Sequence, residues 1–218
     1  MIEFRNVSFR YPSGDAPAFT RLSFFVAKGE TACLSGENGS GKSTLLKIIN
    51  GLLFPSEGEY FFAGERIDRE KMKSTAFEKD LHRKIGFVFQ NPDVQLFNSS
   101  VFEELAFGPR QMGLSPEEVT RRVEDALALL DIARLRRRVP YSLSGGEKRR
   151  VALASVLTMN PSVWTLDEPE TFLDAAGREW LADFLSELKA AGKTVVLSTH
   201  SEALAKKLAD KIITFRPA

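Results

Sequence analysis

Apolar and polar positions in the first third of the chain follow the spacing of short β-strands. β-Branched and aromatic residues concentrate in short segments bounded by turn-forming residues, which is the pattern of strands and hairpins. These segments are residues 2–11, 24–26, 31–35 and 57–67. Between the third and the fourth, leucine and isoleucine recur at helical spacing from Leu45 to Ile49, and Gly51 is a typical helix end.

The middle of the chain changes to the periodicity of amphipathic helices. Ser115 and Glu118, with Pro116 between them, form the pattern of a capping box at a helix start. Apolar residues then recur three and four positions apart, at Val119, Val123, Ala126, Leu127 and Leu130. Residues 91–160 therefore predict a mainly helical lobe.

Strands and helices alternate again in the last quarter of the chain. The predicted strands are 163–166, 194–199 and 212–215, and the predicted helices are 177–188 and 202–209. Because such alternation favours a parallel sheet, the pattern predicts an α/β fold with a mostly parallel sheet. We expect a single domain over residues 1–218, with a core from 1–90 and 161–218 and an inserted helical lobe at 91–160.

Composition excludes several classes of protein. The formal net charge is +1, from 30 basic and 29 acidic residues, so the overall charge predicts no nucleic-acid partner. The single cysteine, Cys33, falls in the buried strand and predicts a reduced structural thiol. No apolar run reaches the roughly 18 residues of a membrane span, and the first residues lack a signal peptide's apolar stretch. We therefore expect a soluble, cytoplasmic protein that serves a membrane only through a partner.

A glycine-rich loop between the strand at 31–35 and the next helix has P-loop spacing: glycine, four residues, then Gly-Lys-Ser. Its glycines allow successive backbone N–H groups to face one phosphate chain, and the helix N-terminus adds a positive dipole. Lys42 is expected to reach the β- and γ-phosphates of ATP, and the Ser43 hydroxyl to ligate Mg²⁺. The predicted nucleotide-binding residues of the loop are Gly36, Asn38, Gly39, Ser40, Gly41, Lys42, Ser43 and Thr44.

Two carboxylates end the predicted strand at 163–166. Acidic residues at the end of a buried strand need a partner for their charge, and Mg²⁺ beside Ser43 would supply it. We therefore assign Asp167 to the metal ion and Glu168 as the general base that activates the attacking water. An acid that caps the next turn is the alternative for either residue.

A second glycine-rich motif, Leu143-Ser144-Gly145-Gly146-Glu147, precedes another apolar-periodic helix. A serine and two glycines at a helix N-terminus form a further phosphate-binding site. Since one ATP rarely needs two such sites, Ser144, Gly145 and Gly146 are expected to complete the ATP pocket of another copy. An ordinary capped helix start is compatible with the same residues.

With both motifs in place, the sequence resembles the ATP-binding cassette (ABC) family, and Leu-Ser-Gly-Gly-Glu resembles its signature motif. The resemblance implies that Tyr11 stacks on adenine and that Gln90 contacts Mg²⁺ and senses the γ-phosphate. It also implies that Asp174 lies in the loop that crosses a dimer interface and that His200 contacts the γ-phosphate. Local packing is the alternative for Tyr11 and His200, and His82 is left as a surface residue.

The resemblance also sets expectations for the fold and the machinery. It implies a P-loop NTPase core with an N-terminal antiparallel β subdomain and an inserted helical subdomain. Two chains are expected to close head to tail around two ATP molecules, as a homodimer or as a heterodimer with a related ATPase. The expected catalytic set is Lys42, Gln90, Glu168 and His200, and the expected Mg²⁺ ligands are Ser43, Gln90 and Asp167.

The stretches at 90–97 and 102–109 resemble the ATPases of energy-coupling-factor (ECF) importers, which take up cobalt, nickel or vitamins such as biotin. In that group the ATPase sits on the inner face of the cell membrane, beneath a coupling subunit that holds a substrate-binding subunit. Four apolar residues there either line a groove for a partner's helix or pack in the helical lobe. They are Leu96, Phe97, Val101 and Phe102.

Two residues depart from the family pattern. Glu170 stands where threonine is common, and Phe172 stands where a small residue is usual. Both fall in the loop expected at the dimer interface, so we expect them to alter contacts or coupling there.

Three other functions share some of these motifs. Glu168 disfavours a module that binds ATP without turnover, and the absence of long heptad repeats disfavours a chromosome-maintenance or DNA-repair ATPase. A third alternative is the ATPase of another ABC importer branch, and only the ECF-like stretches argue against it. A basic cluster that would suggest nucleic acid is interpreted as a solvated helical face. It comprises Arg134, Arg136, Arg137, Arg138, Lys148, Arg149 and Arg150.

Overall fold

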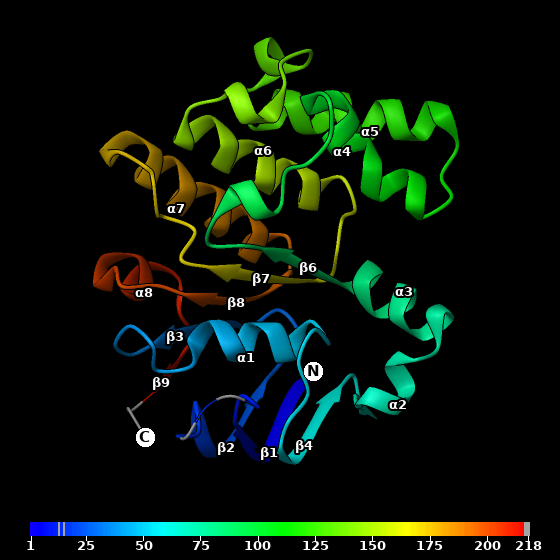
Figure 1. Cartoon of the computed structure of the whole chain (residues 1–218). Helices are drawn as coiled ribbons and strands as arrows, with labels where there is room; N and C mark the ends of the chain where they lie inside the picture. Colours follow the sequence, from blue (N-terminus) through cyan, green and yellow to red (C-terminus); the bar gives the residue numbers. More distant parts are fainter. Residues whose placement is uncertain (13, 15, 216–218) are drawn as a thin grey trace.

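Two β-sheets and a helical layer stack on one another along the length of the molecule. A computed structural model describes residues 1–12, 14 and 16–215. In Figure 1 the antiparallel sheet lies at the bottom, the parallel sheet crosses the middle, and helix α1 (Lys42–Ile49) lies between them. Further helices cover the parallel sheet from above. This arrangement confirms the predicted α/β fold with an antiparallel β part and an inserted helical part.

The first part of the chain builds a four-stranded antiparallel sheet in the order β2-β1-β4-β5. Its strands are β1 (Ile2–Phe9), β2 (Phe19–Val26), β4 (Glu57–Phe62) and β5 (Glu65–Arg66). Phe4 on β1 stacks with Phe24 on β2 and Tyr60 on β4, at centroid distances of 4.7 and 4.8 Å. Such cross-strand aromatic pairs stabilise the sheet. The predicted hairpin turns at Ala63 and Gly64, which both have the positive φ that a two-residue turn requires.

The five-stranded sheet has the order β6-β7-β8-β3-β9, and each neighbouring pair in it is parallel. Its strands are β3 (Thr31–Ser35), β6 (Ile85–Val88), β7 (Val163–Asp167), β8 (Thr194–Ser198) and β9 (Lys211–Thr214). Strands β7 and β8 are buried at every position, which is typical of a parallel sheet covered on both faces. The strands predicted in the last quarter of the chain are confirmed to within one residue at each end.

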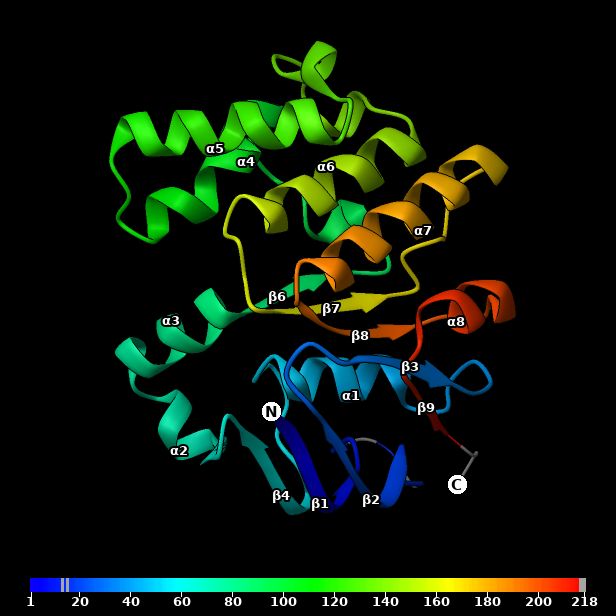
Figure 2. The same ribbon diagram turned by 180° about the vertical axis from the view of Figure 1, so that it is seen from behind.

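Helices cover both faces of this sheet, as Figures 1 and 2 show from opposite sides. Helix α1 packs below it, and α7 (Ala175–Ala190) lies on the other face beside α8 (Glu202–Leu208). The side chains of β3 alternate accordingly. Ala32 and Leu34 pack in the apolar cluster that contains α1, whereas Cys33 packs in the cluster that contains α7.

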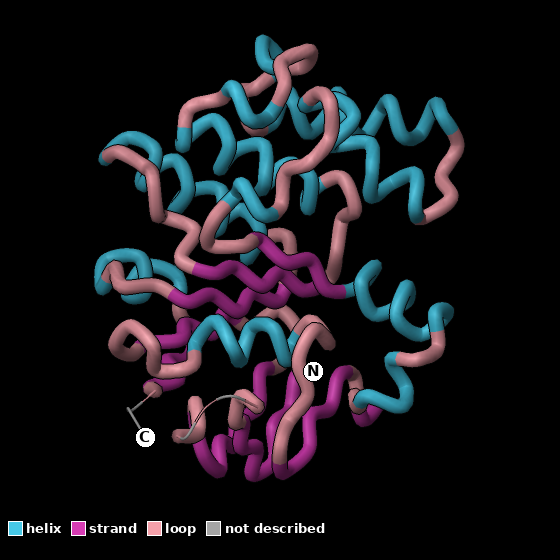
Figure 3. Tube along the Cα trace, in the orientation of Figure 1, coloured by secondary structure: helices cyan, strands magenta, loops and turns pink. Residues whose placement is uncertain are grey.

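Three helices follow β6 and form the upper layer in Figure 3: α4 (Val101–Gln111), α5 (Pro116–Leu129) and α6 (Gly145–Leu157). Ser115 caps α5 by accepting a hydrogen bond from the backbone N–H of Glu118. The predicted capping box is wrong in its second half, because the Glu118 carboxylate binds Arg121 and Arg122 instead. Within the described residues, no helix combines the length and the apolar composition needed to cross a bilayer.

Helices α2 (Arg69–Met72) and α3 (Thr75–Lys84) and strand β6 were not predicted. Helix α3 buries only Leu81, so its sequence carries no apolar stripe, and β6 is four residues long. Gly86 on β6 shows why the sequence there is unusual for a strand. A Cβ atom at this position would lie 2.4 Å from Cγ1 of Val156, so the glycine allows α6 to pack directly on the sheet.

The burial of Cys33 predicts an unreactive thiol. Cys33 is 1 % exposed, and burial raises the pKa of its thiol to about 11. Since the thiolate is the reactive form, we expect the native chain to show no measurable reaction with dithionitrobenzoate over minutes at pH 8. The guanidinium-unfolded chain should release the equivalent of its single cysteine at once. Rapid stoichiometric reaction of the native protein would contradict the burial of β3.

Candidate functional site

The carboxyl ends of the parallel strands bring the predicted nucleotide-handling residues to one edge of the sheet. The glycine-rich loop follows β3, Gln90 lies two residues after β6, Glu168 directly follows β7, and His200 lies two residues after β8. Neighbouring parallel strands end at the same edge, which is where α/β proteins bind ligands. Residues from four distant parts of the sequence therefore meet.

The loop after β3 closes around the Lys42 side chain. Its Nζ atom donates hydrogen bonds to the backbone carbonyl oxygens of Gly36 and Glu37, both at 2.8 Å, and Lys42 is 5 % exposed. Gly36 has a φ of +153°, and a Cβ there would lie 2.8 Å from the carbonyl oxygen of Phe215, so only glycine fits. The loop ends at the N-terminus of α1, and such a helix end binds anions.

Ser40 Oγ, in the same loop, is buried and has no hydrogen-bond partner in the described part of the chain. Buried hydroxyls are nearly always hydrogen-bonded. A hydroxyl in this position is suited to donate to an oxygen of a phosphate ligand held by the loop.

The two carboxylates at the end of β7 lie in different environments. Asp167 is 5 % exposed, and its Oδ1 accepts a hydrogen bond of 2.6 Å from Ser198 Oγ on β8. Glu168 has a left-handed φ of 42°, and its backbone N–H donates to the same Ser198 Oγ at 2.9 Å. The strained backbone turns the Glu168 side chain away from the strand, where Gln90 Nε2 and His200 Nε2 each lie 2.9 Å from one of its carboxylate oxygens.

Gln90 and Glu168 line a cavity of about 620 Å³ together with residues of the glycine-rich loop. Four other predicted site residues do not line it: Gly36, Ser40, Asp167 and His200. Its lining combines an ammonium group, hydroxyls and glycine backbone with a carboxylate and an amide, which suits a polyphosphate and an attacking water. The residues that line it are Tyr11, Ala16, Pro17, Ala18, Asn38, Gly39, Gly41, Lys42, Ser43, Thr44, Gln90 and Glu168.

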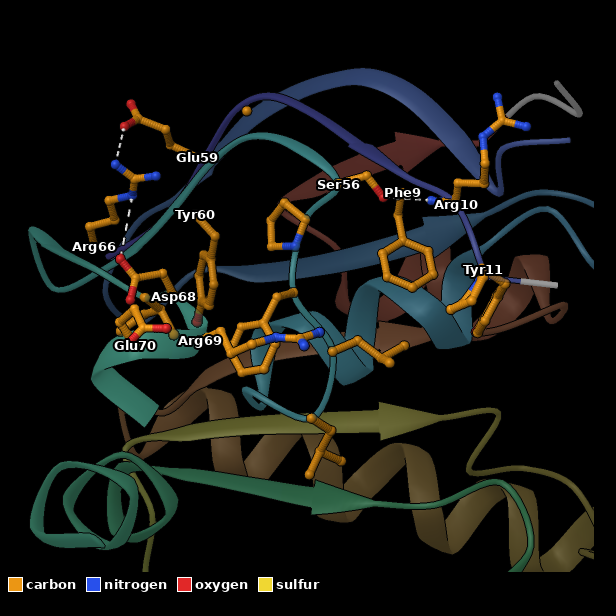
Figure 4. Close-up of a pocket in the computed structure, with 17 residues that line it drawn as sticks. Phe9, Arg10, Tyr11, Ser56, Glu59, Tyr60, Arg66, Asp68, Arg69 and Glu70 are labelled. Atoms are coloured by element: carbon orange, nitrogen blue, oxygen red, sulfur yellow. Dashed lines mark hydrogen bonds and ion pairs between the residues drawn. The ribbon is translucent and has the colours of Figure 1, made fainter. Parts of the chain in front are cut away.

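Tyr11 lines this cavity and is hydrogen-bonded to Thr44, another residue of its lining. Its hydroxyl lies 2.9 Å from Thr44 Oγ1, and its ring meets Phe9 edge-on at 4.9 Å. Tyr11 also lines a second cavity of about 620 Å³, which lies between residues 9–12 and residues 52–70 (Figure 4). In that cavity Arg66 is paired with Glu59 and Asp68, so its charge is already neutralised.

The residues of the Leu-Ser-Gly-Gly-Glu motif and Asp174 do not line this cavity of their own chain. Ser144 caps α6 in a full capping box with Glu147, and Ser144 and Gly145 are exposed at the helix start while Gly146 is half-buried. Asp174 caps α7 by accepting a hydrogen bond of 2.8 Å from the backbone N–H of Gly177. Both helix starts are therefore intact without a partner.

The solvated-face interpretation of the basic cluster is wrong for Arg149. This residue is fully buried and donates hydrogen bonds to the backbone carbonyl oxygens of Phe89, at 2.7 Å, and Gln90. Burial lowers the pKa of its guanidinium to about 10. The sequence contained a signal for this role, since Arg149 lies in helical phase with the buried residues Leu153 and Val156.

Two smaller corrections concern other basic residues. Arg150 is half-buried, and its guanidinium lies 3.9 Å from the Trp180 ring centroid. His82, which the sequence predicts at the surface, is half-buried, and its Nε2 lies 3.1 Å from the carbonyl oxygen of Asn50. Neither belongs to the nucleotide cavity.

The position of Arg149 predicts a large effect on stability. Arg149→Met keeps the length of the side chain but leaves the carbonyl oxygens of Phe89 and Gln90 without their donors, so we expect a loss of about 2–3 kcal/mol. Arg137→Met, at an exposed arginine of the same cluster, should change stability by less than about 0.5 kcal/mol. Urea unfolding monitored by circular dichroism measures both. Equal losses would contradict the role of Arg149.

Comparison with known proteins identifies relatives over nearly the whole chain. A family model described as "ABC transporter" matches residues 19–171. The nickel import ATP-binding protein LarO of Lactiplantibacillus plantarum is 47 % identical over 215 residues, covering 99 % of this chain and 88 % of that protein. The energy-coupling factor transporter ATP-binding protein EcfA of Methanothermobacter thermautotrophicus is 41 % identical over 212 residues, covering 97 % and 67 %.

The fold is also similar to solved structures of ATP-binding cassettes. CbiO1 of Clostridium perfringens, part of the ABC transporter complex CbiONQ, matches with a TM-score of 0.85 and 34 % identity, covering 99 % of this chain and 84 % of that one. A dimeric ATP-binding cassette in a post-hydrolysis state, bound to ADP and phosphate, matches with a TM-score of 0.88 and 32 % identity, covering 99 % and 94 %. The chain therefore belongs to the ABC transporter family of ATP-binding cassette ATPases.

Proposed function

We propose that this chain is the ATP-hydrolysing subunit of an ECF importer for a transition metal ion, cobalt or nickel, or for a vitamin such as biotin. The observation that carries the proposal is the Glu168 carboxylate, which lines the phosphate-loop cavity between Gln90 and His200. The names of the relatives, a nickel import ATPase and an ECF ATPase, support the importer branch. Another ABC importer branch or a non-transport ABC ATPase is the alternative.

The phosphate loop is the proposed site of the ATP triphosphate. Lys42 would exchange its bonds to the carbonyl oxygens of Gly36 and Glu37 for the β- and γ-phosphates. The glycine backbone and the start of α1 would supply N–H donors to the remaining phosphate oxygens. Hydroxyls of the loop complete the set, from Ser40, Ser43 and Thr44, beside the backbone of Asn38, Gly39 and Gly41.

The same edge of the sheet offers hard oxygen ligands for Mg²⁺. The Ser43 hydroxyl and the Gln90 amide line the cavity, and Asp167 is a buried carboxylate with Ser198 Oγ as its neighbour. Oxygen donors of this kind fit Mg²⁺ when some of its ligands are waters and phosphate oxygens. Bound there, the ion would neutralise charge that develops on the phosphates.

Glu168 is the proposed general base. Its carboxylate is 17 % exposed on the side-chain scale and reaches the cavity, so it can accept a proton from a water next to the γ-phosphate. Gln90 and His200 hold its two oxygens at 2.9 Å and are proposed to exchange these bonds for the γ-phosphate and its water.

A second chain is proposed to complete each site. The helix start at Ser144, Gly145 and Gly146 lies outside the cavity of its own chain and has a serine and glycine backbone suited to a phosphate. Asp174 would lie at the same interface. The dimeric relative bound to ADP and phosphate supports this arrangement. The partner chain would be a second copy or a related ATPase.

An apolar groove is the proposed docking site of the membrane coupling subunit. A cavity of about 370 Å³ lies between α3 and α4, and Phe97 and Phe107 are exposed at its rim with their rings 5.2 Å apart. Of the four apolar residues predicted for such a groove, only Phe97 lines it. Val101 is buried in the core, and Leu96 and Phe102 pack against that core. Docking there would hold the chain at the cytoplasmic face of the membrane.

The division of the chain is proposed to follow these tasks. Residues 1–90 and 161–218 would bind and hydrolyse ATP, and residues 91–160 would carry the signature motif and much of the membrane-facing groove. The fold supports this division, since α4, α5 and α6 form one layer above the sheet (Figure 1).

Tyr11 should affect ATP binding through its ring rather than its hydroxyl. Tyr11→Phe removes the bond to Thr44 Oγ1 but keeps the ring, so we expect ATP to bind at least as tightly as to the wild type. Tyr11→Ala removes the stacking surface and should weaken binding about tenfold. Isothermal titration with ATP measures both, and equal weakening by the two variants would contradict stacking on adenine.

Glu168→Gln should abolish turnover without abolishing ATP binding. Loss of a general base lowers the rate by about 10²–10⁴-fold, and the variant should accumulate as an ATP-bound dimer in size-exclusion chromatography. Glu179→Gln, at an exposed position on α7, is the matched control and should turn over normally. Steady-state phosphate release is the assay.

The same assay tests the composite site. Specific activity of the wild type should rise with protein concentration, because each site needs a second chain. A constant specific activity would contradict a two-chain site, and full activity of Glu168→Gln would contradict its role as the base.

A further inference from the structure

Glu170 ties the loop after β7 to the loop after β8. Its Oε1 accepts a short hydrogen bond from the Thr199 hydroxyl and a second one, at 3.3 Å, from the backbone N–H of His200. Thr199 Oγ1 in turn accepts a hydrogen bond of 3.0 Å from the backbone N–H of Ser201. One carboxylate oxygen therefore fixes three consecutive residues centred on His200.

This carboxylate is anchored from within the protein. Thr199 is 6 % exposed, and the second oxygen of Glu170, Oε2, is buried with no hydrogen-bond partner among the residues described. Burial lowers the pKa of Arg149 and raises the pKa of Cys33, and the nearby Glu170 carboxylate opposes the first shift and adds to the second. Glu170 is thus a structural anchor behind the site, whereas Glu168 faces the cavity.

His200 is consequently held at both ends by two carboxylates of one loop. Glu168 Oε1 lies 2.9 Å from the ring atom Nε2, and Glu170 Oε1 accepts from the backbone N–H. The ring is 45 % exposed on the side-chain scale and has no other hydrogen bond among the described residues. Its direction therefore depends on where the backbone of His200 is fixed.

The same loop contacts the start of α6 at its other end. Phe172 has a φ of 69°, which is rare for a bulky residue, and its Cβ lies 3.1 Å from the position a Cβ on Gly145 would occupy. A displacement of the loop that contains Glu170 would therefore also change the contact between Phe172 and Gly145 of the signature motif.

We infer that Glu170 is a positioning residue that sets the backbone of His200, and through it the direction of the His200 ring toward Glu168 and the γ-phosphate. The inference rests on the proposed function for its kinetic consequence, but the positioning itself is independent of turnover. It accounts for a glutamate at a position where the family commonly has threonine, because the longer side chain reaches both Thr199 and the backbone of His200.

The chain offers a direct spectroscopic test because it contains only two histidines, His82 and His200. In ¹H–¹⁵N spectra of the ¹⁵N-histidine-labelled full chain, the His200 ring signals are assigned by their loss in His200→Gln. Glu170→Ala should shift or broaden these signals and leave those of His82 unchanged. Glu170→Gln keeps an oxygen acceptor and should keep the His200 signals near their wild-type positions.

A variant of nearly equal length guards against misfolding. Glu170→Met removes the acceptor but fills the same space, so it should reproduce the effect of Glu170→Ala on His200 in a chain with an unchanged unfolding midpoint. Glu179→Ala is the matched control on the neighbouring helix and should leave both histidines unchanged. His200 signals that stay at their wild-type positions in Glu170→Met would overturn the inference.

Steady-state kinetics and ATP binding together distinguish a positioning role of Glu170 from a general loss of structure. Glu170→Ala should lower kcat about tenfold, as expected for a misplaced reacting group, while the Kd for ATP changes less than about twofold. In a His200→Ala background the same change should have little further effect, because Glu170 acts through His200. Additive losses, or a loss confined to ATP binding, would overturn the inference.

The two tests also separate this inference from the proposed function. If His200→Ala keeps full ATPase activity, the role of His200 in hydrolysis is wrong, while a shifted His200 signal in Glu170→Met still supports the positioning contact. If His200→Ala is inactive and the His200 signal ignores Glu170, the proposed function stands and the inference falls.

Discussion

The parallel pairing of the central strands is the constraint on which the nucleotide site depends. Because β3, β7 and β8 run in one direction and are paired in register, the loops after them emerge at the same edge. Ser198 then lies opposite Asp167 and bonds both its carboxylate and the backbone of Glu168. A shift of β8 by one residue would turn Ser198 to the other face and remove both bonds.

Buried polar side chains reinforce this edge from behind. Asn50 at the end of α1 donates to Thr165 on β7 at 2.8 Å, and Thr165 donates to the carbonyl oxygen of Gly86 on β6 at 2.9 Å. Arg149 on α6 holds the backbone carbonyls of Phe89 and Gln90. These hydrogen bonds fix the relation of helices to strands, and those of Arg149 offset part of the desolvation cost that lowers its pKa.

Several groups of the site are hydrogen-bonded to one another. Lys42 binds loop carbonyls, Tyr11 binds Thr44, and the Glu168 carboxylate binds Gln90 and His200. ATP would have to replace several of these bonds, each with a net value of about 0.5–1.5 kcal/mol.

Local structure was predictable where neighbours in sequence build it. The spacing of Gly36, Lys42 and Ser43 predicts a phosphate loop by itself, and the structure folds this segment as the predicted strand, turn and helix. The sequence also predicted strand β7 and the alternation of strands and helices. Each of these patterns reflects the burial of side chains along a single element. The sequence pattern did not predict helix α3, because this helix buries only Leu81 and its position is set by the elements that it connects.

Only the tertiary structure decided which side chains meet across the fold. Arg149 is a charged residue in a basic run, and its helical phase indicates burial, but only the packing of α6 on β6 shows that its partners are the backbones of Phe89 and Gln90. In the sequence, Glu170 is only a departure from a motif. The structure shows that its carboxylate accepts a hydrogen bond from Thr199, directly after β8. Sequence determines the chemistry that each segment carries, whereas strand order and register determine which of these chemistries lie within a hydrogen bond of one another.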